Sequence, residues 1–191
     1  MNKKNNQRTR ITKLLIKQAY LDLIKEKQTG KITVKDICEK SEINRSTFYL
    51  HFSDPDMVLR ELEDETIQTL KESLLSIGAL DKDKTNAKKH LIAFLHYIHK
   101  HDTIYRTLFV KNTDPTFREK MLGITEEIVL SSFHIPINLE ILTIVNQFIV
   151  HGCLDLICDW IKKDFYMTES NLCDIIYSIC AGCIYGVYNK K

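Results

Sequence analysis

Residues 33–52 read TVKDICEKSEINRSTFYLHF. This stretch predicts two short helices joined by a tight turn. Thr33 is a good N-cap for the first helix, and Asp36, three residues later, completes the spacing of a capping box. Ile37 and Cys38 then give the first helix an apolar face. The local chemistry alone therefore sets the start and the inner side of this helix.

The second helix begins after Asn44, which is also a favoured N-cap residue. Phe48 and Phe52 recur four residues apart and are expected to face a core. The positions left outward are Arg45, Ser46, Thr47, Tyr49 and His51. A short helix that offers one guanidinium and several hydroxyls suits the major groove of DNA, where base edges present donors and acceptors. The two helices therefore predict a helix-turn-helix.

At these residues the chain resembles a known family. The runs 32–37, 43–44 and 47–52 are similar to the DNA-binding domain of TetR/AcrR-type transcriptional regulators. The similarity covers about the first third of the chain, and the rest resembles the family in length and all-helical pattern. The resemblance implies an all-α fold of about nine helices. A three-helix DNA-binding domain at residues 1–53 would precede a helical effector-binding and dimerisation domain at residues 54–191.

The same resemblance implies roles for individual residues. Thr33 and Tyr49 correspond to phosphate-contacting positions, and a helix N-terminus also attracts an anion through its free N–H groups. Arg45 is the residue expected to read a guanine through its bidentate fork. The predicted DNA-contacting set is Thr33, Lys35, Asn44, Arg45, Ser46, Thr47, Tyr49 and His51, with Lys3, Lys4, Arg8 and Arg10 from the N-terminal arm.

Two positions depart from the family pattern. Glu42 stands in the turn where the family usually has Gly, and a non-Gly residue at positive φ is strained. Pro55 stands where the family often has Lys, which removes one expected phosphate contact. Asp54 followed by Pro55 is still a strong helix start.

The charge of the chain is unevenly distributed. Residues 1–51 hold 12 Lys/Arg and 5 Asp/Glu, a net charge of +7, whereas residues 52–191 hold 15 and 20, a net charge of −5. A basic end on an acidic body is typical of a small nucleic-acid-reading module joined to a larger domain.

Hydrophobic periodicity places the other helices. Residues 1–8 are expected to form a mobile arm, and residues 81–89 a polar link. The expected helices span residues 8–27, 55–80, 86–100, 115–132, 138–163 and 168–188, with a short apolar segment at residues 104–110 and a helix end at Ile135–Pro136. No apolar run approaches a membrane span, and the N-terminus carries no apolar signal segment. We therefore expect a cytoplasmic protein without a membrane partner.

The two last helices are candidates for a dimer interface, because small residues recur on one face. One helix-turn-helix reads only a few base pairs. Two DNA-binding domains related by a two-fold axis, here called the two heads, read a palindrome. The predicted interface is Leu142, Ile149, Gly152 and Leu156 on one helix and Ser178, Gly182 and Gly186 on the next.

Aromatic residues of the C-terminal part suggest an effector cavity between helices. The predicted lining is Phe94, Tyr97, His101, Tyr105, Phe109, Phe117, Met121, Phe148 and His151. The resemblance implies that a small apolar or aromatic molecule bound there would change the separation of two heads and release DNA. The alternative for each of these side chains is a place in the core.

Six cysteines without a secretory signal are expected to be reduced thiols, since disulfides belong to oxidising compartments. Cys180 and Cys183 form a C-x-x-C on a helix but lack the second pair of a structural zinc site. His96 and His99 share a face, yet no neighbouring ligand in the sequence completes a metal set. We therefore expect no metal and no cofactor, and a thiol or metal sensor remains the less favoured alternative.

The sequence thus predicts a homodimeric repressor that an effector releases from a palindromic operator. A family member that activates, or that acts through a protein partner without a small ligand, is the alternative. An enzyme is not expected, because no nucleophile–base pair or glycine-rich phosphate loop appears.

Overall fold

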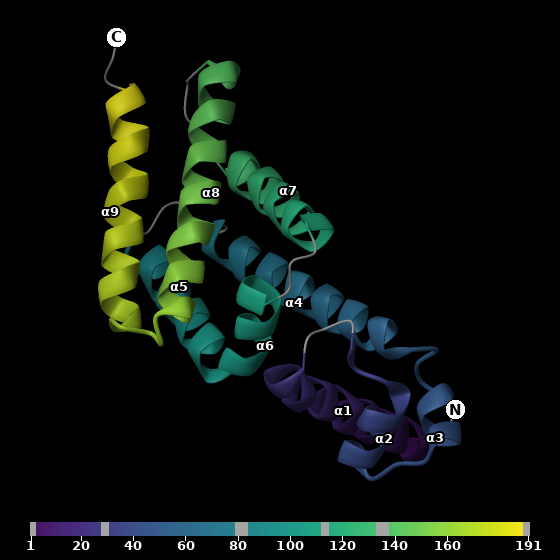
Figure 1. The fold of residues 1–191 in the computed structure, drawn as a ribbon. Coiled ribbons are helices and arrows are strands. Elements are labelled where there is room, and N and C mark those ends of the chain that lie inside the picture. Colours follow the sequence, from purple (N-terminus) through teal and green to yellow (C-terminus); the bar gives the residue numbers. More distant parts are fainter. Residues whose placement is uncertain (1–2, 28–30, 79–83, 112–114, 133–137, 189–191) are drawn as a thin grey trace. The chain divides into compact units, whose positions relative to one another are not determined.

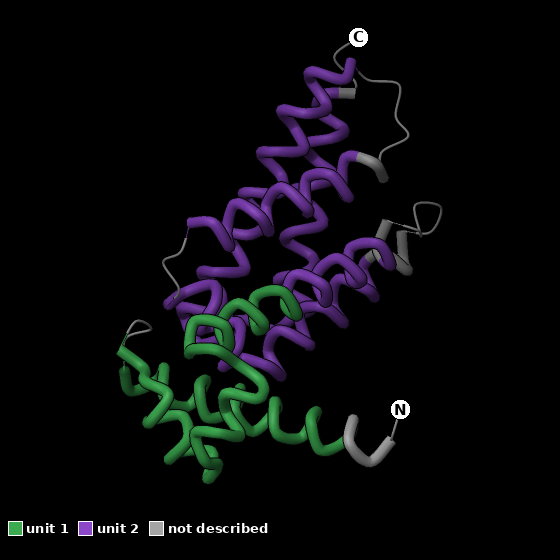
Figure 2. The backbone as a smooth tube through the Cα atoms, turned by 90° about the vertical axis from the view of Figure 1, so that its right-hand side faces the viewer, with its two compact units in different colours: residues 1–66 green, residues 67–191 purple. Residues whose placement is uncertain are grey.

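The structure is a computed structural model that describes residues 3–27, 31–78, 84–111, 115–132 and 138–188 (Figure 1). Over these ranges the chain forms nine α-helices and one turn of π-helix, and it has no strand. The predicted all-α fold class is therefore confirmed. The chain divides into two compact units, residues 1–66 and residues 67–191 (Figure 2).

The first unit contains the predicted helix-turn-helix. Its helices are α1 (Lys3–Glu26), α2 (Val34–Ser41), α3 (Arg45–Tyr49) and the first half of α4 (Pro55–Gly78). Helix α1 begins at Lys3, so the prediction of a mobile arm up to residue 8 is wrong. No glycine or proline interrupts residues 3–10, and the polar residues there can continue the helix into solvent.

A fully buried apolar core holds these helices together. Ile16 and Tyr20 of α1, Ile37 of α2, Phe48 of α3 and Val58 of α4 are all inaccessible to solvent. Phe52 is also buried, and its ring centroid lies 6.0 Å from that of Phe48. The two phenylalanines therefore pack the inner side of α3 and the residues after it into the core, as their spacing predicts.

Ion pairs join α1 to α4 beside this core. Lys17, only 6% exposed, places its Nζ 2.7 Å from Glu61 Oε1 and 2.6 Å from Glu65 Oε1, and Lys13 Nζ lies 2.7 Å from Glu61 Oε2. Burial raises the pKa of Glu61, but the hydrogen bonds from Lys13 and Lys17 outweigh burial and lower it. The buried ammonium of Lys17 is thus compensated by carboxylates.

The predicted capping box at the start of α2 is confirmed. The Asp36 amide donates to Thr33 Oγ1 over 3.2 Å, and the Thr33 amide donates to Asp36 Oδ2 over 2.9 Å. Lys27 Nζ lies 2.8 Å from Asp36 Oδ1. The hydrogen bond from Lys27, followed by those from Thr33, lowers the pKa of Asp36 to about 2.

The turn between α2 and α3 contains the expected strained residue. Glu42 adopts φ 56° and ψ 33°, the left-handed conformation, and its amide donates to the carbonyl of Cys38. An L-residue in this conformation costs about 1–2 kcal/mol relative to a right-handed one. The chain therefore tolerates a strained residue where the family usually has glycine.

Glycine at this turn is expected to stabilise the protein. Glu42→Gly removes the strain, while the added freedom of the unfolded chain offsets about 0.5–1 kcal/mol of that gain. We expect the free energy of unfolding of the first unit to rise by about 0.5–1 kcal/mol in urea denaturation followed by circular dichroism. The matched control is Glu39→Gly, an exposed helical position that should lose about 1 kcal/mol. A loss of stability in Glu42→Gly equal to that of the control would contradict the prediction.

The second unit is a helical body. It comprises the rest of α4, α5 (Lys84–Lys100), α6 (Asp102–Arg106), the π-helical turn η2 (Thr107–Lys111), α7 (Pro115–Ser132), α8 (Leu139–Lys162) and α9 (Glu169–Tyr188). Helices α8 and α9 run side by side in opposite directions, α9 also packs on α5, and α7 packs on α8 (Figure 1). Helix α5 begins at Lys84, inside the predicted link 81–89. The predicted helix end at residues 135–136 lies outside the described residues.

The core of this unit is centred on the end of α8. Trp160 is inaccessible to solvent, and its Nε1–H donates to the carbonyl of Met167 over 2.8 Å. The Phe165 ring meets the indole edge to face, with centroids 4.7 Å apart. Asp164 and Phe165 both have positive φ, which turns the chain tightly from α8 toward α9. This corner fixes the two closing helices as a pair.

Helices α8 and α9 correct one sequence expectation. By length and composition, residues 139–162 and 169–187 are each long and apolar enough to cross a membrane. The expectation that no apolar run approaches a span was therefore wrong. Only 33% and 17% of the two apolar windows are buried inside the chain, so much of their apolar surface is open.

Candidate nucleic-acid interface and ligand cavity

The front of α3 is held by its cap residue. Asn44 Oδ1 accepts from the Thr47 amide over 2.7 Å, the Ser46 hydroxyl over 2.7 Å and the Thr47 hydroxyl over 2.8 Å. Three donors on one oxygen fix the orientation of both hydroxyl side chains. The hydroxyl oxygens keep lone pairs that can accept hydrogen bonds from a ligand.

The outer face of α3 is polar and open. Arg45, Ser46 and Tyr49 are exposed, and Thr47 and His51 are half-buried. Within the described residues the Arg45 side chain makes no hydrogen bond or ion pair, so its guanidinium is available. Tyr49 packs its ring edge to face on Phe48, with centroids 5.6 Å apart, and still exposes 57% of its surface. The outward set that the sequence predicts therefore lies on one surface above a rigid core.

The other predicted DNA-contacting residues differ in whether their side chains already have partners within the chain. Thr33 is exposed, but its hydroxyl donates to Asp36 Oδ2 over 2.8 Å. Lys35 is exposed and lies 3.7 Å from Glu39. Arg8 and Arg10 are exposed on α1 and form no ion pair with described residues. Lys3 and Lys4 begin α1, and their side chains lie outside the described part of the chain.

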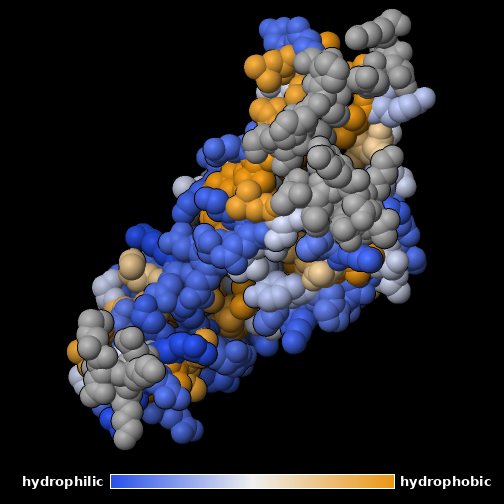
Figure 3. Space-filling view, turned by 180° about the vertical axis from the view of Figure 1, so that it is seen from behind, coloured by the Kyte–Doolittle hydropathy of each residue, from blue (hydrophilic) through white to orange (hydrophobic). Residues whose placement is uncertain are grey.

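A stripe of exposed apolar side chains runs along α8 and continues on α9. We call it the outer stripe, and it consists of Ile141, Ile144, Phe148, Gly152, Ile175, Ile179, Gly182 and Gly186. Ile144 and Phe148 are 66% and 67% exposed. A Cβ built on Gly152, Gly182 or Gly186 would meet nothing within 4 Å, so these glycines are not needed for packing inside the chain. Figure 3 shows the molecule from behind, where orange apolar patches interrupt the polar surface as well.

The predicted dimer-interface residues lie partly on the outer stripe. Gly152, Gly182 and Gly186 belong to it, Ser178 is exposed beside it, and Leu156 is half-buried. Leu142 and Ile149 are buried in the core of their own chain. Helix α8 is apolar on several faces, so periodicity alone did not separate its inner from its outer residues. For the same reason the prediction did not include the exposed residues Ile141, Ile144, Ile175 and Ile179.

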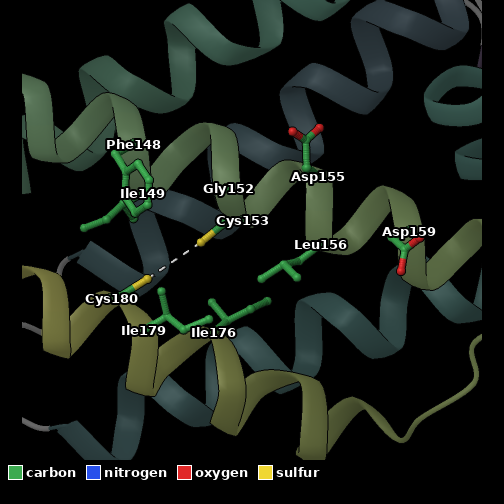
Figure 4. A pocket seen from close by; sticks show the side chains of 10 residues that line it. All are labelled: Phe148, Ile149, Gly152, Cys153, Asp155, Leu156, Asp159, Ile176, Ile179 and Cys180. Atoms are coloured by element: carbon green, nitrogen blue, oxygen red, sulfur yellow. Dashed lines mark hydrogen bonds between the residues drawn. The ribbon is translucent and has the colours of Figure 1, made fainter.

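A groove of about 380 Å³ lies between α8 and α9 beside the outer stripe (Figure 4). Its lining is Phe148, Ile149, Gly152, Cys153, Asp155, Leu156 and Asp159 from α8 and Ile176, Ile179 and Cys180 from α9. Leu156 and Ile176 reach into the space between the helices, and Cys153 and Cys180 point toward each other. The groove is therefore apolar inside, and both carboxylates of its lining are paired with cations, Asp155 with Arg118 over 2.7 Å and Asp159 with Lys163 over 2.9 Å.

A second hollow, of about 340 Å³, lies among α4, α5, η2, α7, α8 and α9 within the second unit. Its lining is Leu70, Leu74, Leu91, Phe94, Phe109, Met121, Leu122, Thr125, Val129, Ile149, Val150, Cys153, Leu154, Ile157, Ile176, Tyr177, Cys180 and Ile184. None of these side chains carries a formal charge when the thiols are protonated. Its size falls at the lower end of ordinary ligand sites.

Only part of the predicted effector-pocket set lines this cavity. Phe94, Phe109 and Met121 do so. Tyr97, His101, Tyr105 and Phe117 form, with Phe109, a chain of neighbouring rings outside it. Phe148 faces the outer groove, and the His151 Nε2 lies 3.0 Å from Glu126 Oε1. Most of the lining is aliphatic, whereas the predicted set was mainly aromatic.

Two side-chain clusters involve residues that the sequence analysis singled out. His99 Nδ1 lies 2.8 Å and His96 Nδ1 3.5 Å from Glu169 Oε1. The carboxylate comes from α9, far away in sequence, which is why it was not found. In the described part of the chain, no three His, Cys, Asp or Glu side chains are placed so that together they could hold a metal ion. Cys180 pairs with Cys153, at 3.7 Å between the Sγ atoms, rather than with Cys183.

Comparison with known proteins gives a family match and one curated relative. Residues 85–182, just over half of the chain, match the family model described as "Transcriptional regulator C-terminal region". The uncharacterized HTH-type transcriptional regulator YxbF of Bacillus subtilis (strain 168) is 20% identical over 151 residues. That alignment takes in 78% of this chain and 39% of the relative, so the chain spans well under half the length of YxbF.

Solved structures share the fold. The fatty acid degradation regulator FadR from Bacillus halodurans has a TM-score of 0.69 at 16% identity, covering 90% of this chain and 95% of that one. The dihydroxyacetone kinase operon activator DhaS has a TM-score of 0.66 at 18% identity, covering 93% and 98%. FadR from Bacillus subtilis in complex with stearoyl-CoA has a TM-score of 0.62 at 16% identity, covering 87% and 96%. All three are described as regulators or activators, not as enzymes.

Proposed function

The chain belongs to the TetR family of transcriptional regulators, and from this premise we propose that it is a homodimeric repressor released from a palindromic operator by an apolar effector. The observation that carries the proposal is the outer surface of α3. It presents the unpaired guanidinium of Arg45 and the oriented hydroxyls of Ser46 and Thr47, and Phe48 is buried on the inner side of the same helix. We assign DNA reading to residues 1–53, within the compact unit that ends at Thr66.

On the operator, contacts to phosphates position the protein and contacts to bases specify the site. Arg45 reads a guanine, and the capped front of α3 brings Asn44, Ser46 and Thr47 to neighbouring base edges. Thr33, Lys35, Tyr49 and His51 hold phosphates on either side. Lys3, Lys4, Arg8 and Arg10 add charge from α1, which compensates for the absence of a lysine at position 55.

The outer stripe supports dimerisation. Apolar side chains that stand two-thirds exposed on a single chain are costly in water, and a second copy related by a two-fold axis would cover them. The open space above Gly152, Gly182 and Gly186 lets helices of the second copy approach closely. Two heads would then read half-sites about 34–36 Å apart. We propose a cytoplasmic location, with these helix faces covered by protein and not by lipid.

The uncharged cavity supports an apolar effector. Burial of hydrocarbon in such a space is favourable by about 25 cal/mol per Å² of surface, whereas a charged group inside it would have no partner among the lining residues. The solved complex of Bacillus subtilis FadR with stearoyl-CoA suggests a chain-like molecule as one model. Helix α4 contributes to both units, so a ligand that prefers one arrangement of α4 shifts the affinity for DNA.

A second candidate function is activation. The structure of DhaS, which shares the fold, is described as that of an operon activator. The DNA-reading surface and the dimer would be the same, and only the position of the operator relative to the promoter would differ. Expression of a reporter gene placed behind the selected operator, measured with and without the protein, distinguishes repression from activation.

Sequence selection from random duplex DNA at near-physiological salt tests the proposed function. The purified chain should enrich a palindrome whose half-sites lie one helical turn apart. A single-copy motif without symmetry would contradict the proposed dimer. Absence of any enriched sequence would overturn the assignment of α3 as a reading helix.

Arg45→Ala is expected to relax this preference at one base pair of each half-site. Loss of a bidentate contact to guanine costs about 1–3 kcal/mol of discrimination at that position, while affinity for random DNA is largely kept. The matched control is Lys35→Ala, which should weaken binding to all sequences alike and lower the salt dependence by about one unit. Repeating the selection with both variants measures this difference. Unchanged preference in Arg45→Ala would refute the assignment of that contact.

A further inference from the structure

We propose that Cys153 of α8 and Cys180 of α9 form a reversible disulfide when the protein meets a hydroperoxide, so that this pair is a modification site. The reduced Sγ atoms already lie 3.7 Å apart and point toward each other across the two helices (Figure 4). A disulfide needs about 2.05 Å between the sulfurs, so a modest rotation of the side chains would close the gap.

The pair differs chemically from three other cysteines of the chain. Cys38, Cys158 and Cys173 are buried, and burial raises the pKa of each thiol. The hydrogen bond that the two thiols share instead lowers the pKa of Cys153, and the same bond, together with burial, raises that of Cys180. The thiolate is the reactive form, so Cys153 is the attacking sulfur and Cys180 the resolving one.

Small reagents can reach the pair from two sides. Both sulfurs belong to residues that line the outer groove and also the apolar cavity. Cys153 and Cys180 are accordingly half-buried, unlike Cys158 on the same helix. If a second copy covers the groove, the cavity still offers a path. These residues, with Ile149 and Ile176, form the wall between the two spaces.

The reaction balances with one hydroperoxide. The Cys153 thiolate attacks the peroxide oxygen, an S–O bond forms, the O–O bond breaks, and the leaving oxygen takes up a proton to give water or an alcohol. The Cys180 thiol then attacks the sulfenic sulfur: the S–S bond forms, the S–O bond breaks, and the hydroxyl leaves as water with the proton of Cys180. The two sulfurs are each oxidised by one electron relative to the thiols, and the peroxide accepts both electrons.

The disulfide would fasten α8 to α9 at the wall between cavity and outer stripe. It joins two residues that lie 27 positions apart and should raise the melting temperature of the second unit by about 5–10 °C. Its effect on DNA rests on the proposed function, because both the cavity and the dimer face border this wall. We expect the oxidised protein to differ from the reduced one by at least about fivefold in operator affinity.

Peptide mapping of the purified full chain after mild hydrogen peroxide treatment tests the site. The expected product has lost two hydrogens, contains a linked pair of peptides with Cys153 and Cys180, and returns to the starting mass with dithiothreitol. Cys180→Ser should stop at a Cys153 sulfenic acid that dimedone traps, and Cys153→Ser should form no link. The matched control is Cys183→Ser, one turn further along α9, which should form the same disulfide as the unaltered chain.

Other products would overturn the inference. These are a link through Cys183, including one between two chains, or oxidation of Cys153 to a sulfinic acid without any disulfide. A mapped disulfide that leaves both operator affinity and melting temperature unchanged would refute the regulatory role. If the reduced protein binds no operator, the proposed function fails, yet the mapping and the melting temperature still decide whether the disulfide site exists.

Discussion

Trp160→Ala is expected to lower the free energy of unfolding of residues 67–191 by about 3–5 kcal/mol. The indole is inaccessible to solvent, and truncation leaves a cavity that the surrounding helices fill only partly. It also leaves the carbonyl of Met167 without the donor 2.8 Å away. The loss is comparable with the whole stability of many domains, so the variant should be partly unfolded at 37 °C.

Circular dichroism at increasing urea measures this loss. Trp160 is the only tryptophan, so tryptophan fluorescence cannot follow the variant. Trp160→Phe should keep most of the packing and lose about 1–2 kcal/mol through the unpaired carbonyl. Tyr166→Ala removes an exposed aromatic from the same corner and should cost less than about 0.5 kcal/mol. Equal losses in Trp160→Ala and Tyr166→Ala would show that the corner is not a stability centre.

The second large effect concerns the outer stripe. The double variant Ile144→Glu, Phe148→Glu introduces two carboxylates per chain at positions that are two-thirds exposed. A single chain tolerates them, whereas the proposed dimer would bury four like charges around its two-fold axis. We expect a monomer in analytical ultracentrifugation. Operator affinity should fall by about 10²–10⁴-fold, because the two heads lose their linkage.

Tyr166→Glu serves as the matched control, since it adds a carboxylate at an exposed aromatic position away from the stripe. It should leave both the association state and operator affinity unchanged. Far-UV circular dichroism of the double variant should match that of the unaltered chain, which separates loss of dimer from loss of fold. A double variant that remains dimeric would place the interface elsewhere.

The features that the sequence predicted well are those determined by near neighbours. The Thr33 cap, the Asn44 cap and the left-handed Glu42 depend on contacts within five residues, and each occurs as expected. The predicted helices 138–163 and 168–188 agree with α8 and α9 to within one residue at each end, and Asn138 and Thr168 cap their starts. The start of α1 was missed because a polar run without glycine or proline is compatible with both helix and arm.

The features that the sequence predicted poorly depend on contacts between distant elements. Glu169 joins His99 from 70 residues away, and Cys153 meets Cys180 from 27 residues away. On α8, Leu142 is buried and Ile144 is exposed, although both are apolar and two positions apart. Only the packing of α6, η2, α7 and α9 on α8 decides which face is inside. The same packing decides which side chains line the cavity, and most of these are aliphatic.

The uncharged lining of the cavity determines where in the cell the proposed effector would mainly be found. Each methylene group that gains about 0.8 kcal/mol on entering the protein gains a similar amount on entering a bilayer. An effector suited to this lining therefore partitions mainly into lipid, and only a small aqueous fraction equilibrates with the cavity. The regulator would then respond to the concentration of the compound in the membrane. Extraction of freshly purified protein with organic solvent should recover co-purified molecules, which mass spectrometry would identify.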